Sequence, residues 1–190
     1  MKVVEIHRLP VSFVHVPVQP HDAVKALIKT AEQNGYEMTV LKAVEAVNER
    51  QKSILFHKLD TAWQHELAGK TVTLWGLAFK PETDDMREAP SLVLIRKLLE
   101  AGCTVRVYDP EAMDECRRRL GDAVIYARDM YEAALDADAL LLVTEWKEFR
   151  LPAWGVLKKT MSGRLIIDGR NVYDADEVRE AGFEYHCIGK

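Results

Sequence analysis

Short apolar runs alternate with amphipathic stretches over the part of the chain that follows residue 69. The apolar runs are TVTLWG, TVRVYD, AVIY, ALLLVT, RLIIDG and FEYHCIG, and their lengths and β-branched content are typical of strands. Helical patterns lie between them at EAMDECRRRLG, at DMYEAALDAD and most clearly at APSLVLIRKLLEAG, which has proline in its first turn and glycine at its end. Because parallel strands need crossover connections, this alternation predicts a Rossmann-like α/β fold, a parallel sheet with helices on both faces.

The segment before residue 69 has helical periodicity instead. The stretch DAVKALIKTAEQNG predicts a short helix with Asp22 as its N-cap and Gly35 as its stop. From residue 36 to residue 68 apolar residues recur at three- and four-residue steps without Gly or Pro, which predicts a second helix of about 30 residues and about 45 Å. A helix of that length is too long for one face of a small domain, so we expect it to support a neighbouring domain or a second subunit.

The first 21 residues carry Pro10, Pro17 and Pro20 among alternating valines. Prolines at that density exclude a helix and favour an extended arm or an edge strand. The sequence therefore predicts three parts. They are an extended leader without an assigned role at 1–21, a central helical segment at 22–68 and a Rossmann-like domain at 69–190.

Composition and charge exclude several classes of function. The chain has 26 basic and 30 acidic residues and a net charge of −4, so it lacks the basic footprint of a protein that binds nucleic acid or an anionic membrane. We find neither an apolar run of about 20 residues nor a signal-peptide pattern. The cysteines Cys103, Cys116 and Cys187 are odd in number and widely spaced, which predicts buried, unpaired thiols in a reducing, cytoplasmic setting.

Ligands of an open parallel sheet bind at the carboxyl ends of the strands, near the point where the strand order reverses. The loop from Gly76 to Arg87 follows the first predicted strand but lacks the GxGxxG glycines of a dinucleotide fingerprint. It offers Lys80 and Arg87, two cations suited to phosphate or carboxylate groups, whose alternative role is to pair with acids of the same loop. Asp84 and Asp85 suggest a metal site, although adjacent loop carboxylates are typically solvated or paired with a cation such as Arg87.

Other strand ends carry further candidates. Asp109 stands where a Rossmann domain places the acid that reads a ribose, but an Asp-Pro pair is also an ordinary turn, and both interpretations stay open. Arg170, in the stretch IIDGRN, is expected to point into the same crevice as Lys80. His57 and His65 are two turns apart on the predicted long helix without a third ligand nearby, which favours a solvated or interhelical role over metal binding. The residues thus predict a nucleotide-type binding domain without an evident catalytic group or metal site.

Four motifs together make the prediction specific. The stretches GLAFKPETDDMREAPS, VYDP, LLLVTEWKEFR and IIDGRNVYD resemble, in that order and at those strand ends, the C-terminal part of the UDP-glucose/GDP-mannose dehydrogenase family. The resemblance covers approximately residues 24 to 189 and includes the family's central helical region. It implies an NAD-dependent oxidation of a nucleotide sugar, with UDP-glucose favoured, to the corresponding uronate through a cysteine thioester, which supplies polysaccharide biosynthesis. It also implies that Phe79, Lys80 and Arg170 contact the UDP-sugar and that Arg87 reaches the NAD.

The chain also departs from the family pattern. The family's nucleophile lies in a Gly-Gly-Ser-Cys-Phe-x-Lys-Asp stretch before the helix that here begins near Val24, where this chain reads VPVQPHDAVKAL. The glycine loop of the family's N-terminal NAD-binding domain is not found either. We therefore expect a nucleotide-sugar-binding part that is inactive alone, that is completed by an N-terminal NAD-binding half and that forms a homodimer through its long helix. The alternative is a non-catalytic module, either a nucleotide-sugar sensor or a dimerisation domain. A phosphoreceiver domain is disfavoured, because Gly76 and Tyr126 stand where it needs acids.

Overall fold

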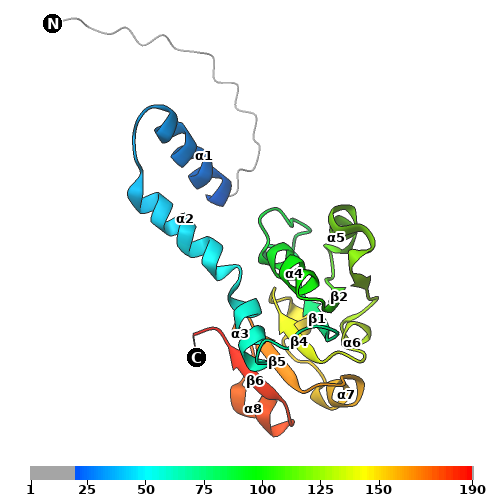
Figure 1. Ribbon diagram of the computed structural model, residues 1–190. Coiled ribbons are helices and arrows are strands. Elements are labelled where there is room, and N and C mark those ends of the chain that lie inside the picture. The colour runs from blue at the N-terminus through cyan, green and yellow to red at the C-terminus, as the bar shows by residue number, and fades with distance from the viewer. Residues whose placement is uncertain (1–19, 190) are drawn as a thin grey trace, which may run out of the picture. The chain divides into compact units, whose positions relative to one another are not determined.

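The computed structural model describes residues 20–189 of the chain, and the described part divides after Val47 into two compact units, 20–47 and 48–189. In the first unit α1 (Pro20–Gln33) is followed by a turn at Gly35 with φ of +74°, and α2 (Thr39–Gln51) begins after it (Figure 1). The predicted stop at Gly35 is confirmed. The predicted N-cap at Asp22 is wrong, because the helix already begins at Pro20, a residue that the first turn accepts. The extended leader predicted for residues 1–21 lies outside the described residues, except for the last two, which are helical.

The single long helix predicted from residue 36 to residue 68 is wrong. Helix α2 ends at Gln51, a turn follows at Lys52 and Ser53, and α3 (Ile54–Ala62) begins a new helix that packs on α4 and β5 of the second unit. The predicted pairing of His57 and His65 on one helix fails for the same reason, since His65 follows α3 with φ of +70°. Helix α3 buries Leu55 and Leu59, so it belongs to the compact unit that holds the sheet.

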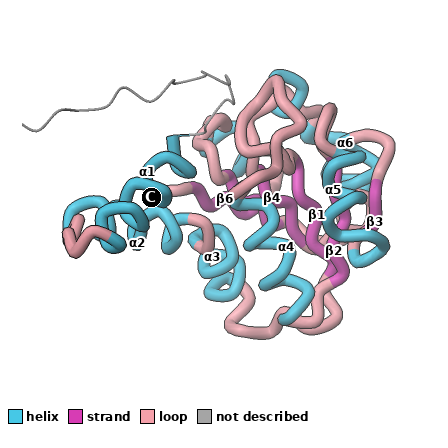
Figure 2. The backbone as a smooth tube through the Cα atoms, turned by 90° about the horizontal axis from the view of Figure 1, so that it is seen from above, coloured by secondary structure: helices cyan, strands magenta, loops and turns pink. Residues whose placement is uncertain are grey.

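Six parallel strands form the sheet of the second unit (Figure 2). They lie in the order β3-β2-β1-β4-β5-β6, and each falls within an apolar run that predicted a strand. The strands are β1 (Thr71–Trp75), β2 (Thr104–Tyr108), β3 (Ile125–Tyr126), β4 (Ala139–Leu142), β5 (Leu165–Asp168) and β6 (Glu184–Cys187). The order reverses between β1 and β4, which makes the carboxyl ends of these two strands the switch point of the fold.

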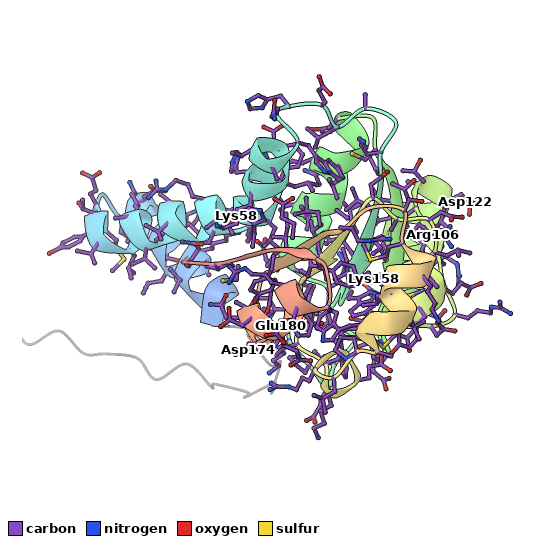
Figure 3. All side chains as sticks on the ribbon, turned by 90° about the horizontal axis from the view of Figure 1, so that it is seen from below. Lys58, Arg106, Asp122, Lys158, Asp174 and Glu180 are labelled. Atoms are coloured by element: carbon purple, nitrogen blue, oxygen red, sulfur yellow. The ribbon has the colours of Figure 1, made fainter. Side chains whose placement is uncertain are left out.

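Helices cover both faces of the sheet, as the sequence predicted. Parallel crossovers are right-handed, and the strand order runs in opposite directions from β1 and from β4, so the helices of the two halves cover opposite faces. The helices α7 and α8 are short and were not predicted from the sequence. Asp174, labelled in Figure 3, caps α8 by accepting from the N–H groups of Asp176 and Glu177 at 2.9 and 3.0 Å. The helices of the sheet region are α4 (Pro90–Glu100), α5 (Met113–Leu120), α6 (Met130–Ala133), α7 (Trp154–Thr160) and α8 (Ala175–Glu180), with 3₁₀ turns at Gly121–Ala123 and Lys147–Phe149.

The core of this unit follows the central strands. Every residue of β4 and β5 is buried, and the Trp75 ring stacks on Phe149 with 5.3 Å between centroids. Cys103, Cys116 and Cys187 are buried and unbridged, which confirms their prediction as small core residues. Within residues 20–189, none of the helices combines the length and the apolar character that crossing a membrane requires. The apolar interior thus fixes the positions of the strand ends, where the polar loops meet.

Candidate functional site

The loops after β1 and β4 are in direct contact at the switch point. Gly76 has φ of +89°, and a Cβ atom at this position would lie 2.5 Å from the Thr144 Cβ. The Thr144 hydroxyl donates to the Ala78 carbonyl at 2.6 Å, and the Ser91 hydroxyl donates to the Leu77 carbonyl at 2.5 Å. The base of the loop that carries Phe79 and Lys80 is therefore fixed from two sides.

The carboxylate of Asp109, at the end of β2, accepts hydrogen bonds from other groups of the chain. Its Oδ2 accepts from the Leu77 N–H at 2.6 Å, the Ala78 N–H at 3.1 Å and the Trp146 indole Nε1 at 3.0 Å. Its Oδ1 accepts from two N–H groups of the turn that follows, at residues 111 and 112. The side chain is 1% exposed, so the structure favours the turn over the ribose-binding interpretation. Asp109 joins three loops at the switch point, a role that the sequence did not predict.

A second buried aspartate organises the loop after β5. Asp168 Oδ1 accepts from the Arg170 N–H at 2.8 Å, and Oδ2 accepts from the Val172 N–H, the Tyr173 N–H and the Tyr185 hydroxyl at 2.8, 3.0 and 2.9 Å. No part of Asp168 is exposed. The backbone of Arg170 is thereby held at the carboxyl end of β5, where the sequence predicted a ligand-binding arginine.

The Arg170 side chain forms a two-point contact with Glu145 from the loop after β4. Its Nη2 donates to Glu145 Oε1 at 2.6 Å, and its Nε contacts the other carboxylate oxygen. Burial is the strongest single influence on Glu145 and opposes its ionisation. The hydrogen bond from Arg170, a backbone N–H and the charges of Arg170 and Arg150 together outweigh burial and lower the pKa of Glu145 below its ordinary value. The Glu145 carboxylate is therefore ionised and pairs with the Arg170 guanidinium.

The predicted cations of the loop after β1 have different surroundings. Lys80 is exposed and forms no ion pair with the side chains described, those of residues 24–189, and the neighbouring Phe79 is 41% exposed. Arg87 instead follows its alternative role, because Nε donates to Asp85 Oδ1 at 3.0 Å and Nη2 donates to Oδ2 at 2.8 Å. Asp85 is committed to Arg87, which weakens the suggestion of a metal site at Asp84 and Asp85.

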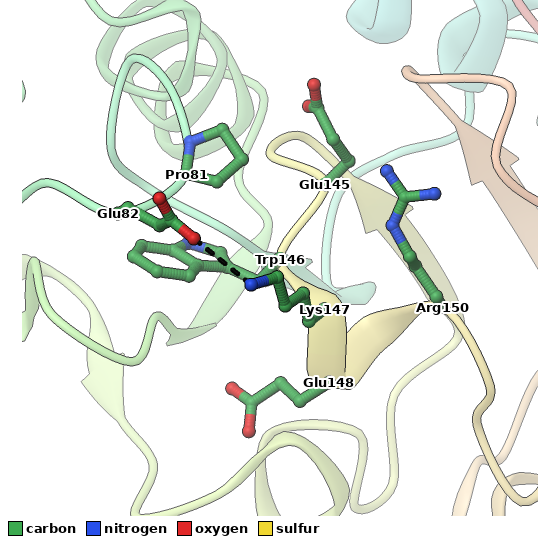
Figure 4. A pocket seen from close by; sticks show the side chains of 7 residues that line it. All are labelled: Pro81, Glu82, Glu145, Trp146, Lys147, Glu148 and Arg150. Atoms are coloured by element: carbon green, nitrogen blue, oxygen red, sulfur yellow. Dashed lines mark ion pairs between the residues drawn. The ribbon is translucent and has the colours of Figure 1, made fainter.

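A pocket of about 450 Å³ lies between the loops after β1 and β4 (Figure 4). The buried Trp146 indole forms part of its lining, and an ion pair between Lys147 Nζ and Glu82 Oε1, 3.3 Å long, connects its two loops. Sequence reasoning placed the TEW motif at this edge but assigned no ligand role to the pocket. The lining residues are Pro81, Glu82, Glu145, Trp146, Lys147, Glu148 and Arg150.

Comparisons with known proteins identify the family of the chain. The model of the UDP-glucose/GDP-mannose dehydrogenase family, UDP binding domain, matches residues 73–175. The UDP-glucose 6-dehydrogenase of Pseudomonas aeruginosa is 49% identical over 172 residues, which cover 88% of this chain and 38% of that protein. The UDP-glucose 6-dehydrogenase of Rhizobium meliloti is 41% identical over 165 residues and is covered to 38% of its length.

A solved structure shows the same relationship. The UDP-glucose dehydrogenase of the hyperthermophilic archaeon Pyrobaculum islandicum superposes with a TM-score of 0.74 at 34% identity, over 87% of this chain and 36% of that chain. The present chain thus spans less than two fifths of the length of these relatives. The matched region 73–175 includes the loops after β1, β2, β4 and β5, which hold all the predicted ligand-binding residues.

Proposed function

Because the chain belongs to the UDP-glucose/GDP-mannose dehydrogenase family, we propose that it is the nucleotide-sugar-binding part of an NAD-dependent UDP-glucose 6-dehydrogenase. The reaction of the whole enzyme is the oxidation of the glucose 6-hydroxymethyl group of UDP-glucose to the carboxylate of UDP-glucuronate. The observation that carries the proposal is the exposed Lys80, which has no ion-pair partner in the described part of the chain and lies on the loop after β1, at the switch point where folds of this class bind ligands.

The proposed substrate contacts use three side chains. The Lys80 ammonium is a compact charge suited to a phosphate oxygen, and the Arg170 guanidinium is a planar fork suited to a phosphate or a carboxylate. The half-exposed Phe79 ring offers an apolar face next to Lys80, against which a base or a sugar ring can pack. Because the backbones of the Lys80 loop and of Arg170 are fixed by Asp109 and Asp168, the ligand would meet a preformed edge.

The proposed cofactor contact is Arg87. Its side chain is half exposed and pairs with the Asp85 carboxylate, and the planar guanidinium that makes this contact is also suited to a phosphate of NAD. NAD, when bound, supplies the hydride acceptor for the oxidation. We propose that Arg87 reaches an NAD held mainly by another domain, because the loop after β1 lacks the glycines that hold a pyrophosphate on backbone N–H groups.

We propose that the cysteine that forms the thioester is none of Cys103, Cys116 and Cys187. Burial raises the pKa of Cys103 and of Cys116 to about 11, so both remain neutral thiols at pH 7. Cys187 is buried in β6. The same observation supports the alternative of a non-catalytic nucleotide-sugar-binding module, which would use the binding edge without a nucleophile. The cytoplasmic location expected from the sequence stays a prediction.

Helix α2 supports the proposed homodimer. Val40, Val44 and Val47 recur at helical spacing and are 76%, 46% and 44% exposed in the first unit, which gives this helix an apolar stripe without cover among the described residues. We propose that this stripe contacts a second copy of the chain. Val44→Glu should convert a dimer to a monomer in light scattering, whereas Lys29→Glu, on the neighbouring helix, should not.

Calorimetric titration of the chain with UDP-glucose and UDP-glucuronate tests the binding proposal. Lys80→Ala and Arg170→Ala should each weaken binding about 10-fold or more, because each removes a charge-assisted hydrogen bond. Lys159→Ala, which removes an exposed charge from α7, is the matched control and should leave the affinity unchanged. Absence of binding to the unsubstituted chain, or equal affinity of all four proteins, would contradict the proposal.

A second experiment separates the enzyme from the binding module. The chain is mixed with a separately expressed NAD-binding half from one of the related enzymes, together with UDP-glucose and NAD, and NADH is followed by absorbance. The enzyme proposal expects NADH formation that depends on Lys80 and Arg87. A module that binds UDP-glucose but never supports NADH formation with any such half would favour the alternative.

A further inference from the structure

Two arginines lie around one glutamate at the edge of the pocket. Arg170 holds Glu145 by two contacts, one of them a hydrogen bond of 2.6 Å. Arg150 lines the same pocket, on the side where Glu145 lies and away from the ion pair of Lys147 with Glu82 (Figure 4). Arg150 is exposed and forms no ion pair with the residues that the structure describes, yet its charge contributes to the low pKa of Glu145. Arg170 is therefore paired with a carboxylate, whereas Arg150 has no ion-pair partner among the described residues.

The contact between Arg170 and Glu145 has the form of a ligand contact. A planar guanidinium that faces two carboxylate oxygens is the geometry by which arginine recognises phosphate and carboxylate groups of ligands. The two side chains are 43% and 23% exposed, and ion pairs with that access to solvent contribute little to stability. A ligand anion can therefore replace Glu145 at a small cost in free energy.

The exchange requires a movement of side chains but not of the backbone. The Arg170 backbone is fixed by its hydrogen bond to Asp168, and Trp146, which follows Glu145, is fixed by its indole hydrogen bond to Asp109. A Glu145 released from Arg170 would remain near the incoming anion and repel it, unless another cation takes its charge. Arg150 is the cation that lines the pocket on that side.

We propose that Glu145, Arg150 and Arg170 form an anion-exchange site, in which Glu145 occupies Arg170 until a phosphate or carboxylate group of a ligand replaces it and Arg150 then pairs with the released Glu145. Arg150 is thus a positioning residue, which acts on the ligand through Glu145. The inference rests on the proposed function in one respect, because it takes Arg170 as a ligand-binding residue. It adds that Glu145 competes with the ligand anion for Arg170 and thereby sets the affinity of the site for that anion.

Titration of the chain with inorganic pyrophosphate tests the exchange without a nucleotide. The Arg170 and Arg150 Nε–H signals are followed by NMR in ¹⁵N-labelled protein, and affinities come from the same titrations. Glu145→Gln keeps the size of the side chain but removes the competing charge, so the pyrophosphate affinity should rise several-fold, the factor that corresponds to an ion pair with this access to solvent. Arg150→Gln should lower the affinity several-fold, because Glu145 then returns to Arg170 more readily.

The double variant gives the decisive comparison. If Arg150 acts through Glu145, Arg150→Gln has no effect in the Glu145→Gln background, and the two substitutions are non-additive. If Arg150→Gln weakens binding equally in both backgrounds, Arg150 contacts the anion directly and the exchange is overturned. Failure of Glu145→Gln to raise the affinity also overturns it. Lys159→Gln controls for net charge, and circular dichroism confirms that each variant is folded.

Different ligands separate this inference from the proposed function and identify the anion. Free glucuronate tests a carboxylate and pyrophosphate tests a phosphate, so the tighter of the two in Glu145→Gln identifies the group that replaces Glu145. If pyrophosphate or glucuronate shows the expected pattern but UDP-glucose does not bind, the exchange stands and the proposed function fails. If UDP-glucose binds but Glu145→Gln leaves every affinity unchanged, the exchange alone fails. If none of the ligands binds to any variant, both are rejected.

Discussion

The indole Nε1 of Trp146 donates a hydrogen bond to Asp109 Oδ2 at 3.0 Å, which joins the loop after β4 to the end of β2 across the intervening strand β1. The same oxygen accepts from the N–H groups of Leu77 and Ala78, at the start of the loop after β1. One buried carboxylate oxygen thus connects the loops of three adjacent strands. The geometry of the switch point depends on this atom.

Replacement of Asp109 by Asn should destabilise the chain by about 2–4 kcal/mol. Five N–H groups donate to the carboxylate, and an amide would turn its NH₂ group toward some of them, which leaves buried donors without an acceptor. Trp146→Phe removes one of the five donors and should cost about 1–2 kcal/mol. Urea denaturation measures both values. A smaller loss for Asp109→Asn than for Trp146→Phe would show that the carboxylate does not organise the three loops.

Gly76→Ala should destabilise the chain by about 2–4 kcal/mol. The substitution combines a left-handed backbone at φ of +89° with a Cβ atom 2.5 Å from the Thr144 backbone nitrogen, so strain and overpacking add together. Thermal unfolding measures the loss. Gly155→Ala is the matched control, because a Cβ atom there meets nothing within 4 Å and lies in α7. It should change stability by between zero and about 1 kcal/mol, in the stabilising direction. Equal effects at the two positions would contradict the close approach of the loops.

Lys52→Met should destabilise the turn between α2 and α3 together with the end of the loop after β1. The Lys52 ammonium donates to Glu49 at 2.8 Å and to Glu88 at 2.6 Å, and its side chain is only 10% exposed. Glu88 has φ of +57°, a conformation that needs support from its surroundings. We expect a loss of about 1.5–3 kcal/mol, the range of hydrogen bonds to charged groups.

Hydrogen exchange shows which residues lose stability in Lys52→Met. In Lys52→Met the amides of Arg87 and Glu88 should exchange faster, while those of β4 should change only as far as global stability falls. Lys159→Met, which removes an exposed lysine of α7, should leave both sets unchanged. Unchanged exchange at residues 87 and 88 would mean that Lys52 supports the helices but not the loop.

The contact of Lys52 with Glu88 shows which part of the fold could not be predicted from the sequence. The strands could be predicted because their apolar runs are local signals that also determine burial in the sheet. The break between α2 and α3 could not, because the segment has no glycine or proline and the helix is interrupted where Lys52 pairs with Glu88, 36 residues further along the chain. A local pattern carries no information about a partner at that separation.

The candidate site was predictable to a similar depth. The predicted strand ends place Lys80 and Arg87 on the loop after β1 and Arg170 on the loop after β5, as the structure has them, while their role in ligand binding stays a prediction. The rule that ligands bind at strand ends could not distinguish Asp109, which accepts hydrogen bonds from the chain itself, from a ligand-binding acid, because three of its five donors lie 31 to 37 residues away in the sequence. The partner of Arg170 was missed for the same reason, since Glu145 follows another strand.

Glu148→Gln should stabilise the chain at neutral pH but not in acid. Burial is the main cause that raises the pKa of Glu148; a hydrogen bond from the Tyr108 hydroxyl opposes it, and the charges of Asp109 and Asp129 act with burial. In the unfolded chain this carboxyl ionises near its ordinary pKa of about 4.3. Because the folded pKa is the higher of the two, the unfolded state loses its proton first as pH rises, and folding becomes less favourable between the unfolded and the folded pKa.

The difference in stability between Glu148→Gln and the unsubstituted chain should therefore be small below about pH 4 and should grow as the pH rises, until it reaches a plateau above the folded pKa. Urea denaturation at a series of pH values measures it. Gln can still accept the Tyr108 hydrogen bond, so the variant isolates the charge. Glu180→Gln, on the exposed surface of α8, is the control and should show no such pH dependence. A stability difference that is independent of pH would mean that Glu148 has the same pKa in the folded and in the unfolded chain. Its charge would then not destabilise the fold.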